Sequence, residues 1–182
     1  MRAGRLLSIT AAVLLAVLAS GGGPASAQGE FPPFAQAGLT AHNTYRARHG
    51  SPSMILVQDL VTRAQQCAQH YAQKGTIDHS CAFKNNAGEN LAMAVGGGNA
   101  DPVQNVQTAT KAWYDEIRNY DFNHPGFSMD SGHFTQLVWK ASTRLGIGFA
   151  SQNNKRVVVA LYVQVGNMSP ASYFEENVPR PR

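Results

Sequence analysis

Apolar side chains recur at three- and four-residue steps in three separate segments, which is the spacing of one buried face of an α-helix. The first segment ends before Gly50 and the second before Gly75, and glycine commonly ends a helix. The third follows Asp101 and Pro102, a typical N-cap residue with proline in the first helical position. The apolar positions, assigned to the core, are Phe34, Leu39, Ala41, Tyr45 and Ala47, then Leu60, Ala64, Cys67, Ala68 and Tyr71, then Val103, Val106, Ala109, Trp113, Ile117 and Tyr120.

The last third of the chain changes to a strand-like pattern rich in Val, Phe and Tyr. Residues 134–140, 145–151 and 156–165 predict β-strands, and the turn-forming residues 152–155 predict a hairpin between the last two. Residues 156–165 are nearly all apolar, so both faces of that strand should be covered. Residues 76–98 predict a loop, interrupted by a short helix at 90–94. Helices followed by antiparallel strands predict an α/β fold: a three-layer α-β-α sandwich with a central, mainly antiparallel sheet.

The start of the chain has the layout of a secretory signal peptide. Arg2 and Arg5 precede an apolar run at residues 6–19, and small residues ending at Ala27 form a cleavage site. An uncleaved anchor helix is the alternative, but a bilayer span needs about 20 apolar residues. We therefore predict a secreted, extracellular protein with a signal peptide at 1–27, a linker at 28–34 and one domain at 35–182.

Charge and hydropathy exclude several classes of partner for the mature chain. Loss of Arg2 and Arg5 lowers the formal net charge from +4 to +2, and no long basic run remains, so a nucleic-acid partner is not expected. No second apolar stretch predicts a transmembrane segment. We expect a monomer or a weak homodimer.

The chain contains two cysteines, Cys67 and Cys81. In an exported protein such a pair forms a disulfide more often than a metal or redox site, and the spacing is not that of a CxxC motif. Two free buried thiols are the alternative. We predict a disulfide between them.

The segment GHFTQLVWKAS, from Gly132 to Ser142, resembles the signature of the CAP superfamily of cysteine-rich secretory, antigen 5 and pathogenesis-related proteins. Four further segments follow the order of that family: AHNTYR from Ala41, the pair His79 and Ser80, GENLA from Gly88 and WYDEI from Trp113. The segments NYDFNHPGF and YFEENV are similar to the Golgi-associated plant pathogenesis-related branch. Two features depart from the pattern. The usual cysteine of the second family signature is missing, and the chain begins Met-Arg, so the N-myristoylation of that branch is not expected.

The resemblance implies a cleft formed by four polar residues, His79, Glu89, Glu116 and His133. Two imidazoles and two carboxylates suit Zn²⁺ or another divalent metal, with the carboxylates as ligands or as groups that orient the rings. The spacing alone contains no local metal-binding motif, so a metal-free hydrogen-bonded network is the alternative. The other histidines are assigned elsewhere: His42 to a structural role on the first helix, His49 and His70 to solvent-facing helix positions, and His124 to an exposed loop.

The same resemblance implies three uses for such a domain. A serine nucleophile has been proposed for the Golgi-associated branch after the GENLA segment, but Val95 occupies the matching position, and no GxSxG or HExxH motif is present. We therefore expect a non-enzymatic protein, with a metal-dependent hydrolase or protease as the alternative. Sterol or other lipid binding would use the loop at 95–104, with Gly96, Gly97 and Gly98 as its hinge. Defence or signalling through an extracellular protein partner is the third use.

Overall fold

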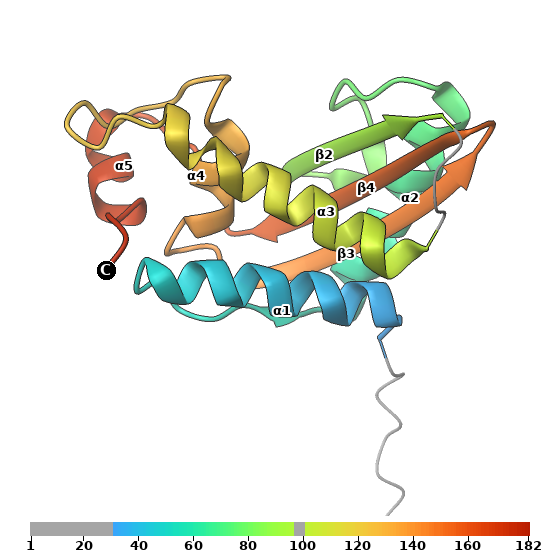
Figure 1. The fold of residues 1–182 in the computed structure, drawn as a ribbon, viewed down its shortest axis with the longest axis horizontal. Coiled ribbons are helices and arrows are strands. Elements are labelled where there is room, and N and C mark those ends of the chain that lie inside the picture. The colour runs from blue at the N-terminus through green and yellow to red at the C-terminus, as the bar shows by residue number, and fades with distance from the viewer. Residues whose placement is uncertain (1–30, 97–100) are drawn as a thin grey trace, which may run out of the picture. The chain divides into compact units, whose positions relative to one another are not determined.

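A four-stranded sheet lies between two layers of helices in the computed structural model of the protein, which describes residues 31–96 and 101–182 (Figure 1). The predicted signal peptide at 1–27, residues 28–30 of the predicted linker, and Gly97 and Gly98 lie outside the described residues. The elements are α1 (Pro33–Arg48), β1 (Ile55–Leu56), α2 (Gln58–Lys74), the 3₁₀ helix η1 (Ala82–Lys84), β2 (Gly88–Val95), α3 (Pro102–Asp115), the 3₁₀ helix η2 (Glu116–Asn119), α4 (Gly132–Val138), β3 (Arg144–Gln152), β4 (Lys155–Val163) and α5 (Ala171–Asn177).

The sheet has the strand order β1-β3-β4-β2. Only the β1–β3 pairing is parallel; β3 with β4 and β4 with β2 are antiparallel. The predicted hairpin joins β3 to β4, and Asn153 and Asn154 take positive φ angles of 48° and 62°, as a tight hairpin turn requires. The predicted three-layer sandwich with a mainly antiparallel sheet is therefore confirmed.

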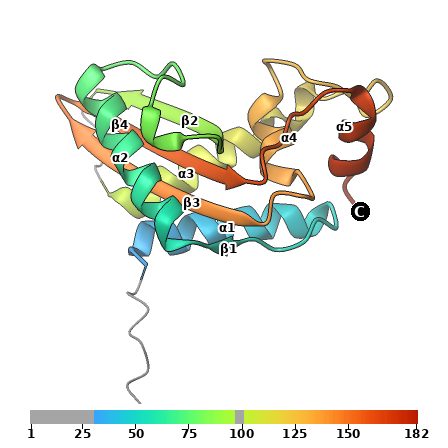
Figure 2. The ribbon, with the colours of Figure 1, turned by 180° about the vertical axis from the view of Figure 1, so that it is seen from behind.

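Each face of the sheet packs against its own helices. Along β4, Val158, Ala160 and Tyr162 point into the core beneath α1 and α3, whereas the alternate residues Val157, Val159 and Leu161 point toward α2. Figure 1 shows α1 and α3 over one face, and Figure 2 shows α2 across the other. This alternation explains why the whole strand reads as apolar.

Helix α2 lies directly on the backbone of β3. A side chain at Gly146 would collide with the backbone of Leu60, and one at Gly148 would collide with the carbonyl of Ala64. These glycines therefore let the helix approach the sheet more closely than a side chain would permit. Gly75, with φ 80°, ends α2 in the left-handed conformation, as the sequence predicts.

Two predicted elements are wrong in type. Residues 134–140 form most of α4 and the turn after it rather than a strand. The five residues from Phe134 to Val138 are all buried, including the polar Thr135 and Gln136, and a short run that is buried on every side has no exposed positions whose spacing would distinguish a helix from a strand. Residues 90–94 belong to β2 rather than to a helix. There Leu, Ala and Met favour a helix, but pairing along the length of β4 overrides that local preference.

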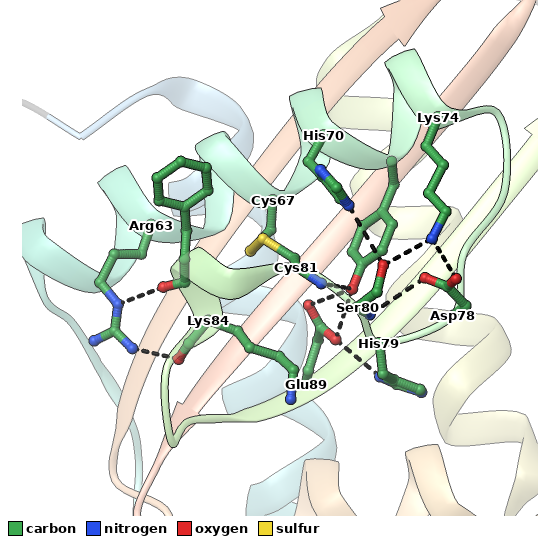
Figure 3. Close-up of a disulfide and its surroundings, with 12 residues drawn as sticks. Arg63, Cys67, His70, Lys74, Asp78, His79, Ser80, Cys81, Lys84 and Glu89 are labelled. Atoms are coloured by element: carbon green, nitrogen blue, oxygen red, sulfur yellow. Dashed lines mark hydrogen bonds and ion pairs between the residues drawn. A yellow bond between two sulfur atoms is a disulfide. The ribbon is translucent and has the colours of Figure 1, made fainter.

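The predicted disulfide between Cys67 and Cys81 is present, with the two Cα atoms 5.5 Å apart. Cys67 belongs to α2, and Cys81 follows the loop that leaves the end of that helix (Figure 3). The bond therefore fixes this loop, which carries His79, against the helix. Within the described residues, no helix is both long and apolar enough to cross a membrane.

Candidate functional site

His79 and Glu89 form the first of two histidine–carboxylate pairs. His79 lies in the loop after α2, and its Nδ1 is 2.8 Å from Oε2 of Glu89, which stands near the start of β2 (Figure 3). The Glu89 side chain is only 2% exposed, whereas the His79 side chain is 56% exposed. The buried carboxylate of Glu89 therefore holds an imidazole ring that is exposed to solvent.

Glu89 is itself held by Tyr71 of α2. The Tyr71 hydroxyl lies 3.2 Å from Oε2 and 3.4 Å from Oε1 of Glu89, and it accepts a hydrogen bond from the backbone N–H of Cys81 at 3.0 Å. Burial first, and then the nearby charge of Glu89, raises the pKa of Tyr71 well above its usual range, so the hydroxyl stays a donor. The sequence assigns Tyr71 to the core alone. Its ring is buried as predicted, but helical spacing gives no sign of the role of its hydroxyl group.

Glu116 and His133 form the second pair, where the end of α3 meets the start of α4. Nδ1 of His133 is 2.6 Å from Oε1 of Glu116, whose other oxygen accepts the backbone N–H groups of His133 at 3.0 Å and Phe134 at 3.3 Å. The His133 ring also stacks on Trp113, with the ring centroids 6.1 Å apart. One carboxylate thus fixes both the ring and the first turn of the helix that carries it.

Asn90 links the two pairs. It follows Glu89 in β2, and its side-chain amide donates to the backbone carbonyl of His133 at 3.0 Å and to the hydroxyl of Tyr162 at 3.0 Å. The strand that carries Glu89 is therefore tied directly to the helix that carries His133. The sequence analysis did not single out Asn90, although it is the third residue of the GENLA segment.

The four predicted residues do not lie together as a single group of metal ligands. Within residues 31–96 and 101–182, no three His, Cys, Asp or Glu side chains lie together in a way that could hold an ion. Each carboxylate is instead bound to the Nδ1 atom of a histidine. A carbonyl or carboxylate on Nδ1 keeps the proton there and leaves Nε2 as the basic nitrogen. Neither Nε2 atom has a hydrogen-bond partner among the described residues, so both are available as metal ligands.

His42 has the structural role that its place on the first helix predicts. Its Nδ1 donates to the carbonyl of Gly38 at 2.7 Å, and its Nε2 accepts from the hydroxyl of Tyr162 at 2.9 Å. Burial lowers the pKa of His42 from 6.5 to about 4, because the charged ring would lose its hydration. This histidine is therefore neutral at physiological pH.

The solvent-facing position predicted for His49 is wrong, since the residue is 1% exposed. Its Nδ1 donates to the carbonyl of Pro179 at 2.6 Å, and its Nε2 accepts from the Tyr114 hydroxyl at 3.1 Å. The C-terminal segment covers this end of α1, which the local helical pattern does not reveal. His70 is partly buried, whereas His124 lies in an exposed loop as predicted.

The neutral state of buried His42 predicts a loss of stability in acid. The unfolded chain takes up a proton near pH 6.5, but the folded protein does so only near pH 4, so stability falls as the pH falls through this window. We expect urea denaturation to show a free energy of unfolding about 2–3 kcal/mol lower at pH 4.5 than at pH 7.5 from this residue alone. In His42→Gln, which does not titrate, the difference between the two pH values should shrink by that amount. An identical pH dependence in both proteins would contradict the assignment.

A separate cavity of about 430 Å³ lies between the end of β2, the start of β4 and α3. Its lining is mainly small and apolar but includes amide, hydroxyl and guanidinium side chains; the residues are Ala92, Met93, Ala94, Gln104, Asn105, Thr108, Ala109, Ala112, Arg156 and Val158. Arg156 donates from Nη1 to the carbonyl of Gly96 at 2.8 Å. Of the three glycines predicted as a lipid-binding hinge, Gly96 therefore lies beside this cavity, while Gly97 and Gly98 lie outside the described residues.

The fold is an α-β-α sandwich, and it carries two linked histidine–carboxylate pairs. These two features define the class of protein that the signature segments predict. The chain belongs to the CAP family: residues 39–166 match the profile described as the cysteine-rich secretory protein family. It is 40% identical over 146 residues to Golgi-associated plant pathogenesis-related protein 1 of Homo sapiens, covering 79% of this chain and 91% of that protein. The predicted resemblance is thereby confirmed.

Two further comparisons extend this assignment. The chain is 36% identical over 159 residues to the protein named secreted protein RBT4 of Candida albicans, covering 82% of this chain but only 41% of that longer relative. Among solved structures, that of NaASP2 with Zn²⁺ has a TM-score of 0.64 at 24% identity, covering 81% of this chain and 90% of that one. At that identity the likeness supports the fold alone.

Proposed function

We propose that the protein is a secreted CAP-domain protein that binds a divalent metal ion, Zn²⁺ before others, through Nε2 of His79 and Nε2 of His133. One observation carries this proposal. Both rings donate from Nδ1 to a carboxylate that is anchored by other donors, and neither Nε2 has a partner among the described residues. This is the arrangement by which proteins orient metal-binding histidines.

The donor set fits zinc or copper better than calcium or magnesium, because imidazole nitrogen suits the former and oxygen ligands the latter. In this proposal Glu89 and Glu116 lie behind the two metal-binding rings. Each carboxylate accepts the Nδ1 hydrogen of one imidazole and so fixes the tautomer and direction of that ring. Tyr71 and the backbone of α4 hold the carboxylates in turn. NaASP2, whose solved structure contains Zn²⁺, has this fold.

The same contacts favour binding over catalysis. A metal-dependent hydrolase needs a general base within reach of an attacking water. Glu89 and Glu116, the two carboxylates of the site, are both engaged on imidazole Nδ1 atoms, and Glu116 also accepts two backbone N–H groups. A non-enzymatic role therefore agrees better with the geometry than the alternative of a metal-dependent hydrolase or protease.

Native mass spectrometry of protein recovered from culture medium tests secretion and metal binding together. We expect a chain that begins at Gln28 and, after addition of Zn²⁺, carries one bound ion. The leader-like start of the chain, its disulfide and the relative named as a secreted protein all support export. A mass that retains residues 1–20, or no retained zinc, would contradict the respective half of the proposal.

Lipid binding is a second candidate function, favoured by the cavity beside Gly96. Its volume of about 430 Å³ is within the range of small-molecule sites, and six of its ten lining residues are alanine, methionine or valine. Extraction of a labelled sterol should therefore be lost in Ala112→Trp, which fills the cavity, and kept in Ala171→Trp on the exposed face of α5. Unchanged extraction by the Ala112 variant would remove this candidate, and an extracellular protein partner would remain.

A further inference from the structure

A hollow of about 280 Å³ lies on the outer side of α2, away from the sheet. It is lined by Gln66, Gln69, His70, Gln73 and Phe83. The α2 residues that pack on the sheet are a different set, which includes Ala64, Cys67 and Tyr71. The hollow is therefore a feature of the surface rather than a gap in the core. None of its lining residues belongs to either histidine–carboxylate pair, although Nε2 of His70 lies 3.4 Å from Oγ of Ser80, the residue after His79.

Three glutamines in the hollow offer unused hydrogen-bonding groups. The side-chain amides of Gln66, Gln69 and Gln73 have no hydrogen-bond partner among the described residues, whereas neighbouring Gln65 is fully used, with both amide atoms on the backbone of Phe149. From Gln66 to Gln73 the helix advances roughly 10 Å. Each amide presents donors and an acceptor together, so these three glutamines suit a ligand whose groups both donate and accept hydrogen bonds.

Phe83 supplies an aromatic surface at the same hollow, and its backbone is firmly held. The residue is 51% exposed and lies in η1, close to the disulfide at Cys81. Arg63 of α2 donates from Nε to the carbonyl of Phe83 at 2.9 Å and from Nη2 to the carbonyl of Lys84 (Figure 3). Phe83 is thus kept at the surface by bonds to its backbone rather than folded against the core.

We propose that this hollow binds a neutral oligosaccharide about two sugar rings long. Sugar hydroxyls donate and accept as the glutamine amides do, and the C–H face of a pyranose ring packs on an aromatic ring such as Phe83. None of the five lining residues is Asp, Glu, Lys or Arg, which disfavours acidic glycans and nucleic acids. This inference does not depend on the proposed metal site.

Titration of ¹⁵N-labelled protein with chitotetraose and with cellotetraose tests the proposal. At least one of these neutral probes should shift the side-chain amide signals of Gln66, Gln69 and Gln73, with saturation near about 1 mM. Tetragalacturonate, an acidic probe of similar length, should leave these signals unchanged. Phe83→Ala should weaken binding at least about tenfold, and Gln69→Ala several-fold.

Tyr173→Ala is the matched control, because Tyr173 is also a half-exposed aromatic residue but lies on α5, away from α2. It should bind the neutral probe as tightly as the unaltered protein. Spectra of each variant report directly whether the fold is retained. The proposal is overturned if neither neutral probe shifts the glutamine amides, if Phe83→Ala binds as well as the unaltered protein, or if the acidic probe binds equally well.

Discussion

Replacement of both His79 and His133 by alanine is expected to lower the affinity for Zn²⁺ by more than about 100-fold. The proposed site has two imidazole ligands, and no group of three His, Cys, Asp or Glu side chains in the described part of the chain could replace them. The fold should survive, because the side chains of His79 and His133 are 56% and 32% exposed and lie outside both core clusters. Calorimetric titration at pH 7.5 measures the affinity, and circular dichroism checks the fold.

Companion variants separate ligands from orienting groups. Glu89→Gln and Glu116→Gln should each weaken zinc binding by about 10- to 100-fold without abolishing it, since they alter the groups behind the rings. Glu175→Gln, on α5, should have no effect. Binding should also weaken in acid, because imidazole binds metal only when neutral. Unaltered affinity in the double histidine variant would reject the site.

Replacement of Arg46 by methionine is expected to destabilise the fold by about 3–5 kcal/mol. Arg46 is 0% exposed, and burial lowers its pKa to about 10, so it remains charged at neutral pH. Its guanidinium donates to four backbone carbonyls, those of Pro52 at 2.8 Å, Leu137 at 2.9 Å, Trp139 at 2.8 Å and Lys140 at 3.4 Å. Methionine would fill much of the volume but leave these carbonyls without their donor.

Urea denaturation measures this loss, with Arg48→Met as the control. Arg48 lies on the same helix but is exposed, and its guanidinium approaches the rings of Tyr45 and Tyr114, at 5.1 Å and 5.7 Å from their centroids. Its replacement should cost no more than about 1 kcal/mol. A loss below about 1 kcal/mol in Arg46→Met would show that the carbonyls around the guanidinium find other donors.

Local signals in the sequence were sufficient for much of the fold. The cap at Asp101 is present, with its side chain accepting from the N–H of Val103 at 2.9 Å, and Gly75 ends α2. The hairpin was likewise predicted from neighbouring residues, and the disulfide from the presence of two cysteines in a chain with a predicted signal peptide. The two errors of element type arose where distant partners decide the structure. Pairing with β4 makes β2 a strand, and burial on all sides hides the helical period of α4.

The candidate site was likewise predicted only in part. The resemblance to the CAP family identified its four polar residues, and residue types alone suggested a divalent metal. The pairing of each histidine with one carboxylate, and the contacts made by Tyr71 and Asn90, depend on segments far apart in the chain. The buried place of His49 depends on the C-terminal segment. No spacing rule within a helix or strand reports such contacts.

A crystal structure of the protein with Zn²⁺, with the ion located by its anomalous scattering, tests the proposed metal site most directly. The expected result is one zinc peak bonded to Nε2 of His79 and Nε2 of His133 at about 2.0–2.1 Å. Glu89 and Glu116 should remain on the two Nδ1 atoms. A peak on carboxylate oxygens alone, two rings that face away from each other, or no peak at these residues would contradict the proposed site.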